Sequence, residues 1–253
     1  MSAREQETRI LPDFEALSRC AAEEFVRRAR KAVKIQDRFM VVLSGGSTPK
    51  RLYELLGDPN QEFRPQIPWE FIHFFWGDER HVPPEHSDNN YRMARDAMLG
   101  DVPVPAKHVH RIESENPDPE AVADKYEATL RECFRLREDE IPRFDLVLLG
   151  IGPCGHTASL FPATEALHET RRLVVAQWVK RFNAFRITLT PPILNNAAEI
   201  MFLVSGEDKA SVLQTILEGD YRPDEYPAQL IAPRDGKLLW LADAAAASRL
   251  RDL

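Results

Sequence analysis

A glycine-rich turn that contains His156 carries the side chain best suited to acid–base chemistry. The turn, GIGPCGHTASLFP (residues 150–162), follows an unbroken apolar run at 144–149 that is typical of a buried strand. We expect His156 at the entrance of a helix, where the positive end of the helix dipole keeps the imidazole neutral. A lone histidine is more often structural than catalytic. Its place in a glycine turn after a strand makes a general base as good an interpretation as a structural histidine, and the residues by themselves leave both open.

The same turn satisfies the dinucleotide-binding pattern, with Gly150, Gly152 and Gly155 at the required spacing. Two observations argue against a nucleotide. Pro153 occupies the approach to the helix, and the next strand, predicted at 173–176, has no acidic residue at its end to bind a ribose. A nicotinamide-dependent oxidoreductase is therefore the least favoured interpretation.

A second glycine-rich turn, SGGSTP at residues 44–49, predicts an anion site. Gly45 and Gly46 precede a helix, so several backbone N–H groups lie beside the positive end of the helix dipole. Ser47 and Thr48 add hydroxyl donors. The turn lacks the Gly-Lys-Ser/Thr ending of a Walker A loop. The alternative is an ordinary capped helix after a tight turn.

Charged side chains follow the apolar run at 71–76. Asp78, Glu79 and Arg80 place two carboxylates and a guanidinium at the end of a predicted strand. An arginine can bind a phosphate or a carboxylate with two hydrogen bonds. Charge runs are usually solvated surface clusters, so this motif is weak by itself. We take Asp78 and Arg80 as candidate catalytic residues.

Two further cations are candidates for binding an anion. Arg186 begins a predicted strand, and Lys209 opens the helix that follows Ser205 and Gly206. A cation at a helix N-terminus is unfavourable without an anionic partner, which favours a functional role for Lys209 over a solvated one. We expect both cations to converge on an anion at the strand ends.

The elements that must position these residues alternate between helix and strand. The apolar spacing predicts helices at 14–35 (with Asp13 as N-cap), 49–57, 89–99 and 119–137. Apolar runs predict strands at 40–43, 71–76, 144–149, 173–176, 186–190, 200–204 and 238–241. This alternation indicates a mostly parallel sheet covered by helices on both faces, which binds ligands at the carboxyl ends of its strands. We read residues 1–253 as one domain, with the proline-rich stretch 101–119 as a crossover.

Composition limits the class of protein. The chain has 253 residues, 43% of them hydrophobic, and a net charge of −7, so it has no long-range attraction for nucleic acid or an acidic membrane. Its first residues are polar and lack the apolar core of a signal peptide, and no apolar run is long enough to predict a membrane span. Its three cysteines are widely spaced and indicate reduced thiols, so we expect a cytoplasmic protein. No sequence pattern indicates an oligomer interface, and a monomer is slightly favoured.

Five motifs in order carry a family resemblance: SGGSTP, GDERHVPPEHSDNNY, GIGPCGHTASLFP, RITLTPPILNNA and SGEDKA. Together with YPAQLIAP near the carboxyl end, they cover nearly the whole chain. The combination resembles the 6-phosphogluconolactonase family. The resemblance implies a three-layer α/β/α sandwich with a Rossmann-like sheet, shared with glucosamine-6-phosphate deaminases and ribose-5-phosphate isomerases.

The resemblance also implies roles for particular residues. The family's catalytic histidine corresponds to His156, its glycine-rich loop to residues 45–49, and its active-site arginine to Arg80. The family usually has an aspartate where this chain has Cys154, which raises a question about the strength of the base. The implied activity is hydrolysis of the δ-lactone of 6-phosphogluconate in the oxidative pentose phosphate pathway.

The hypothesis that follows is a lactonase in which the turn at 45–48, Lys209 and Arg186 bind the 6-phosphate. His156 activates water, and Arg80 or backbone donors stabilise the oxyanion. Ester hydrolysis needs no cofactor, and the other histidines match no metal-ligand spacing. The rivals are a phosphosugar deaminase or isomerase on the same fold, and a non-catalytic phosphosugar-binding regulator.

Overall fold

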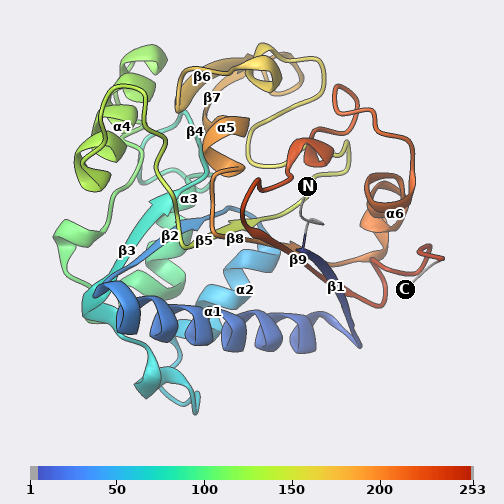
Figure 1. Cartoon of the computed structure of the whole chain (residues 1–253), viewed down its shortest axis with the longest axis horizontal. Coiled ribbons are helices and arrows are strands. Elements are labelled where there is room, and N and C mark those ends of the chain that lie inside the picture. The colour runs from blue at the N-terminus through green and yellow to red at the C-terminus, as the bar shows by residue number, and fades with distance from the viewer. Residues whose placement is uncertain (1–4, 252–253) are drawn as a thin grey trace.

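The computed structural model describes residues 5–251, and within them one sheet of six parallel strands runs through the molecule (Figure 1). All five strand pairings in it are parallel. The predicted α/β/α class is confirmed. In spatial order the strands are β1 (Glu5–Leu11), β9 (Lys237–Asp243), β8 (Glu199–Val204), β5 (Leu146–Leu149), β2 (Phe39–Leu43) and β3 (Ile72–Trp76).

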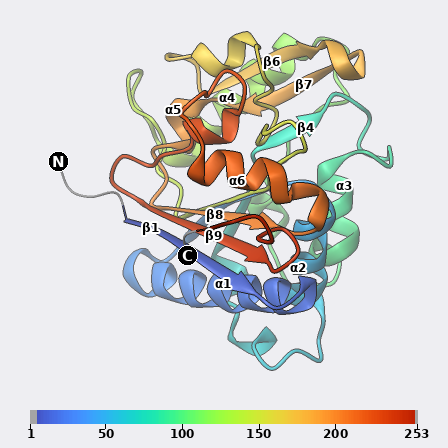
Figure 2. The same ribbon diagram turned by 90° about the vertical axis from the view of Figure 1, so that its right-hand side faces the viewer.

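The central strands are buried on both faces, which explains why they are apolar without alternation. Every residue of β2 and β5 is buried, and so is every residue of β8 after Glu199. Helices α1 and α2 cover one face, and α4, α5 and α6 lie on the other (Figures 1 and 2). Their bounds are α1 (Phe14–Gln36), α2 (Ser47–Gly57), α4 (Pro119–Phe134), α5 (Pro191–Leu194) and α6 (Ala210–Glu218).

The predicted helices are present, with small differences at their ends. Asp13 caps α1 as expected, since its side chain accepts a hydrogen bond from the backbone of Ala16. Helix α2 begins at Ser47, two residues before the predicted start, so Ser47 and Thr48 lie in its first turn. The helix predicted at 89–99 is α3 (Asn90–Ala94), which continues as a π-helical turn at Arg95–Leu99.

A second sheet was not expected. It has three antiparallel strands, β4 (Asp78–Arg80), β7 (Ala184–Leu189) and β6 (Val174–Val179). The runs at 173–176 and 186–190 are therefore strands, as predicted, but lie outside the parallel sheet. The physical reason is the connection: residues 180–183 form a tight turn, which can join only antiparallel neighbours because a parallel pair needs a long crossover.

The two sheets meet at Gly77, the residue that follows the carboxyl end of β3. Its N–H donates to Leu43 O at the end of β2 (2.9 Å), and its carbonyl accepts from Leu189 N at the end of β7 (2.9 Å). Two buried tyrosines hold the adjacent backbone. The Tyr53 hydroxyl bonds to both N and O of Ser44, and the Tyr126 hydroxyl does the same at Trp76. The edge at which ligands bind in such sheets is thus rigidly held.

Within residues 5–251 no helix is both long and apolar enough to cross a lipid bilayer. The longest helix, α1, is amphipathic: Leu17, Ala21 and Phe25 are fully buried, while its other face carries charged residues.

Candidate active site

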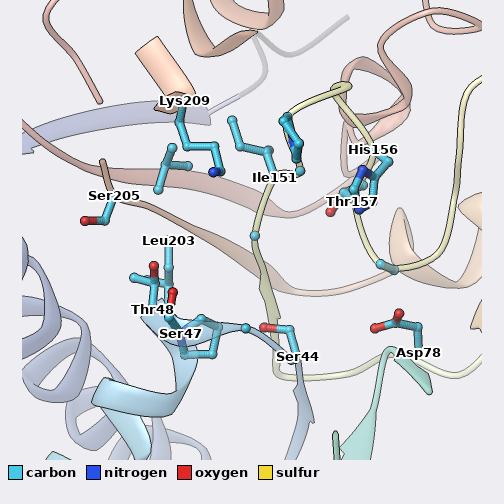
Figure 3. A pocket seen from close by; sticks show the side chains of 18 of the residues that line it. Ser44, Ser47, Thr48, Asp78, Ile151, His156, Thr157, Leu203, Ser205 and Lys209 are labelled. Carbon is cyan, nitrogen blue, oxygen red and sulfur yellow. The ribbon is translucent and has the colours of Figure 1, made fainter. Parts of the chain in front are cut away.

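A pocket of about 430 Å³ opens at the carboxyl ends of β2, β5 and β8, which is where the sequence predicts a ligand-binding site. The turns after these three strands line it, and β4 contributes Asp78 and Arg80. In Figure 3, Lys209 and Thr48 lie toward one end of the pocket, and His156 and Asp78 lie toward the other. The pocket therefore has an end suited to an anion and an end suited to acid–base chemistry.

The first end is built on the turn that leads into α2. Gly46 has φ 106° as the residue before the helix, a conformation that favours glycine. At Gly45 an added Cβ would lie 2.1 Å from Oδ1 of Asn90, so only glycine fits against that side chain. The backbone conformation thus requires Gly46, and the close approach of the Asn90 side chain requires Gly45. The first turn of α2, with Ser47 and Thr48, faces the pocket and presents N–H groups to an anion.

Lys209 lies across from this turn. It ends a short 3₁₀ helix (Glu207–Lys209) directly before α6, so it precedes the helix rather than lying inside it. The turn is held by Asp243 at the end of β9, whose carboxylate accepts from the Ser205 hydroxyl and from Gly206 N. The Lys209 ammonium contacts the carboxylate of Asp208. An arriving phosphate must compete with that carboxylate or take up a position beside it.

His156 is in the pocket, but no helix begins there. The residues after it form a turn closed by a bridge between Thr157 and Leu160. The expected helix dipole is therefore absent, and the ring is kept neutral for another reason. Burial, followed by the nearby cations Arg181 and Arg186, lowers the pKa of His156 to about 4. Since Arg80 and Lys209 act in the same direction, the imidazole is uncharged at neutral pH.

The glycines around His156 have a packing role that explains them without a nucleotide. A Cβ at Gly152 would lie 1.7 Å from Cε1 of the imidazole. Gly155 has φ 75°, and a Cβ there would lie 2.8 Å from the ring of Tyr226. The imidazole's Nδ1 lies 3.1 Å from Sγ of Cys154. Gly152 thus allows the close packing of His156, and Gly155 that of Tyr226, without any nucleotide.

Asp78 and Arg80 extend from β4 toward the same pocket. The Asp78 carboxylate is buried and accepts a hydrogen bond of 2.6 Å from the hydroxyl of Ser159. The Arg80 guanidinium donates to the carbonyl of Asp88 at 2.6 Å. Both side chains are therefore anchored, so they enter the pocket in defined orientations.

Arg186 does not line the pocket, contrary to the expectation that it meets Lys209 there. It lies on β7 directly opposite Arg80 of β4, because the two strands pair in antiparallel register. Burial and the Arg80 charge lower the pKa of Arg186. The two guanidiniums carry like charges on neighbouring strands and repel each other. Together they add positive potential to the end of the pocket that contains His156.

Glu79 is a residue whose role the sequence did not indicate. It is fully buried, and its carboxylate accepts from the backbone N–H groups of Arg80, Asn90 and Tyr91 at 2.7–2.9 Å. Burial raises its pKa to about 7 even though these hydrogen bonds act to lower it. Glu79 joins β4 to the start of α3, which places the Asn90 amide against Gly45. Its position inside a charged motif was the only signal.

Among the described residues, no group of three or more His, Cys, Asp or Glu side chains is arranged to hold a metal ion. The groups that converge on the pocket are hydrogen-bond donors, two cations, one imidazole and the carboxylates of Asp78 and Asp208. Such a set recognises an anionic small molecule and can move a proton near it.

Fold and site together define an α/β protein with a small-molecule pocket built for an anionic ligand. The chain belongs to the family of glucosamine-6-phosphate isomerases and 6-phosphogluconolactonases, whose model matches residues 12–240. The resemblance seen in the sequence motifs is thereby confirmed.

Individual proteins of known name are similar over almost the full length. The chain is 41% identical to 6-phosphogluconolactonase of Nostoc sp. over 95% of its length and 97% of the relative. It is 42% identical to the enzyme of that name from Synechocystis sp., over 88% and 90%. The solved 6-phosphogluconolactonase of Trypanosoma cruzi superposes with a TM-score of 0.85 at 28% identity, covering 99% and 98%.

Proposed function

We propose that this protein hydrolyses 6-phospho-D-glucono-1,5-lactone to 6-phosphogluconate, the lactone step of the oxidative pentose phosphate pathway. The names of its relatives support this activity. The observation that carries the proposal is that one pocket holds both an anion-binding turn and a neutral imidazole, at opposite ends (Figure 3). A phosphosugar lactone has its anion and its reactive carbonyl at opposite ends too.

The 6-phosphate binds between the first turn of α2 and Lys209. Backbone N–H groups at Gly45–Thr48 and the hydroxyls of Ser47 and Thr48 donate to its oxygens, and the Lys209 ammonium neutralises its charge. These contacts are the same in the ground state and the transition state, so they act on binding and on the position of the ring.

His156 then acts as the general base. With its proton on Nδ1, the ring donates to Sγ of Cys154, and the Nε2 lone pair accepts a proton from water. The resulting hydroxide attacks C1, and the bond between C1 and the ring oxygen breaks. The proton held by His156 passes to that oxygen, which becomes the C5 hydroxyl. Atoms and charges balance without a cofactor.

Arg80 stabilises the negative charge that develops on the C1 oxygen, since its guanidinium is anchored at Asp88 and lines the pocket. Asp78 shares this end of the pocket and orients the lactone by accepting hydrogen bonds from the sugar hydroxyls. Arg186, which pairs with Arg80 across β4 and β7, contributes through its charge. We assign it no direct contact with the phosphate.

The deaminase alternative is disfavoured by two motifs. The deaminase relatives usually carry Met-Asp-Glu-Tyr where this chain has Gly77–Arg80, and Phe-Asn-Glu-Pro where it has Ser159–Pro162. The missing acidic and phenolic groups are those that ring-opening isomerisation uses. A non-catalytic regulator would not need an imidazole in the pocket at the end opposite the anion-binding turn (Figure 3).

The test generates the lactone in situ by oxidising glucose 6-phosphate and follows its decay with and without the protein. Ammonia release from glucosamine 6-phosphate is measured in parallel. We expect fast lactone decay, no ammonia, and a loss on the order of a hundredfold or more in His156→Ala. Lactone decay at the spontaneous rate, with a folded wild-type protein, would refute the proposal. Ammonia release would support the deaminase instead.

A further inference from the structure

The imidazole of His156 is packed against an aromatic ring that the mechanism above does not use. The ring of Phe161 stacks on it with centroids 4.2 Å apart and planes inclined by 25°. The backbone of Gly152 closes on the same imidazole, as the 1.7 Å approach of an added Cβ to Cε1 shows. These contacts leave the imidazole little freedom to rotate, and the stacked Phe161 shields one face of the ring from water.

A second aromatic ring supports the first from the surface. Phe161 is only 6% exposed, whereas Phe182, in the turn between β6 and β7, is 44% exposed. Their centroids are 5.6 Å apart in an edge-to-face arrangement. The guanidiniums of Arg181 and Arg186 lie over the Phe182 ring at 5.7 and 5.2 Å. The turn of the second sheet is thus connected to the imidazole through two rings.

We propose that Phe161 is a positioning residue for His156, supported from outside by Phe182. Phe161 acts in two ways, by fixing the plane of the imidazole relative to the lactone and by excluding water from one of its faces. The inference rests on the proposed function only in naming the reaction that the positioned base serves. The contact itself is a property of the free protein.

The electrostatic surroundings of His156 give this role a signature that a purely structural phenylalanine lacks. The groups that act on the imidazole are the Cys154 thiol at Nδ1 and four cations, Arg80, Arg181, Arg186 and Lys209. Burial is the largest cause of the low pKa of His156. Opening one face of the ring to water therefore raises that pKa toward its ordinary value of 6.5.

The experiment compares Phe161→Leu, Phe161→Tyr and Phe63→Leu. Phe63 is a matched control because it is 8% exposed and lies outside the pocket. We expect Phe161→Leu to lose roughly tenfold or more in kcat with KM within about threefold, because a misplaced base affects only the transition state. The acidic limb of kcat/KM should move to higher pH. Phe161→Tyr keeps the aromatic ring, so its kcat and its acidic limb should stay close to those of wild type. Phe63→Leu should change stability alone.

Two further measurements keep the proposal testable in every case. Phe182→Leu alters an exposed ring and should give a smaller shift of the same sign even if Phe161→Leu folds poorly. An NMR titration of His156 in wild type and in the Phe161 variants reports the imidazole pKa without any substrate. An unchanged His156 pKa and kcat in Phe161→Leu would overturn the proposal, as would an equal shift in Phe63→Leu. Absence of lactonase activity in the wild type would refute the proposed function, and the titration would still decide this inference.

Discussion

Sγ of Cys154 lies 3.1 Å from Nδ1 of His156, although only one residue separates them in the turn. The intervening Gly155 has a positive φ, so the chain turns sharply between the two residues. The thiol thus takes the position in which an acceptor would orient the imidazole. It is also close enough to be considered as a nucleophile.

We predict that Cys154 is a passive partner of His156. Cys154→Ser should keep most of the activity, because a hydroxyl also accepts from Nδ1–H. Cys154→Asp should match or exceed wild type, because a carboxylate strengthens the base. Initial lactonase rates for both variants, and for wild type treated with iodoacetamide, check this. Cys20→Ser, in α1 and away from the pocket, is the control. Collapse of activity in both Cys154 variants would mean that the thiol is the nucleophile.

The acidic limb of kcat/KM should lie well below pH 6.5, because burial and nearby cations lower the pKa of free His156 to about 4. Arg181 is the first of these cations, so Arg181→Gln should move the limb to higher pH. Lys180→Gln removes an adjacent charge that is not among the main causes of the low pKa of His156, and serves as the control. The measurement is kcat/KM from about pH 4 to 8. A limb that stays in place in Arg181→Gln would show that Arg181 does not influence the base.

Lys209→Ala should mainly raise KM, by roughly tenfold or more, and leave kcat close to wild type. The reason is that phosphate contacts are equally strong in the ground state and the transition state. Steady-state kinetics of Lys209→Ala and of Lys50→Ala, an exposed lysine of α2 outside the pocket, are compared. A fall in kcat at unchanged KM would place Lys209 near the reacting carbonyl.

A histidine cluster far from the pocket should make stability depend on pH. Nδ1 of His73 lies 3.1 Å from Nε2 of His110, and burial lowers the pKa of each to about 4. Unfolding returns the pKa of each histidine to about 6.5. Between about pH 4 and pH 6.5 the unfolded chain therefore binds more protons than the folded protein. The stability that the cluster contributes is therefore complete above about pH 6.5 and is lost as the pH falls toward 4.

Urea midpoints at about pH 7 and pH 4.5 measure this effect. His110→Gln should narrow the difference between the two midpoints, since a neutral side chain has no proton to gain. His86→Gln, at an exposed position, should leave the difference unchanged. An undiminished difference in His110→Gln would assign the pH dependence to other groups.

Much of the site could be predicted because it depends on local signals. Glycine turns after apolar runs marked the ends of β2, β5 and β8, and parallel strands bring such ends to one edge. For this reason the turn at Gly45–Thr48, His156 and Lys209 were expected together and line one pocket. The first and longest helix, α1, could also be predicted from the sequence. Its apolar residues recur with helical spacing, and its N-cap, Asp13, directly precedes it.

What only the tertiary structure decided depends on contacts between distant segments. Strand β1 is polar and pairs with β9, more than two hundred residues later, so no local pattern marks it. Arg186 was predicted as a cation at a strand end, but antiparallel pairing places it opposite Arg80 and outside the pocket that Lys209 lines. The sequence also predicted a neutral His156 by way of a helix dipole. The neutrality instead comes from burial and from the charges of Arg181, Arg186, Arg80 and Lys209, which lie on separate segments. A pKa depends on all the groups around a side chain in space and not only on those adjacent in the chain.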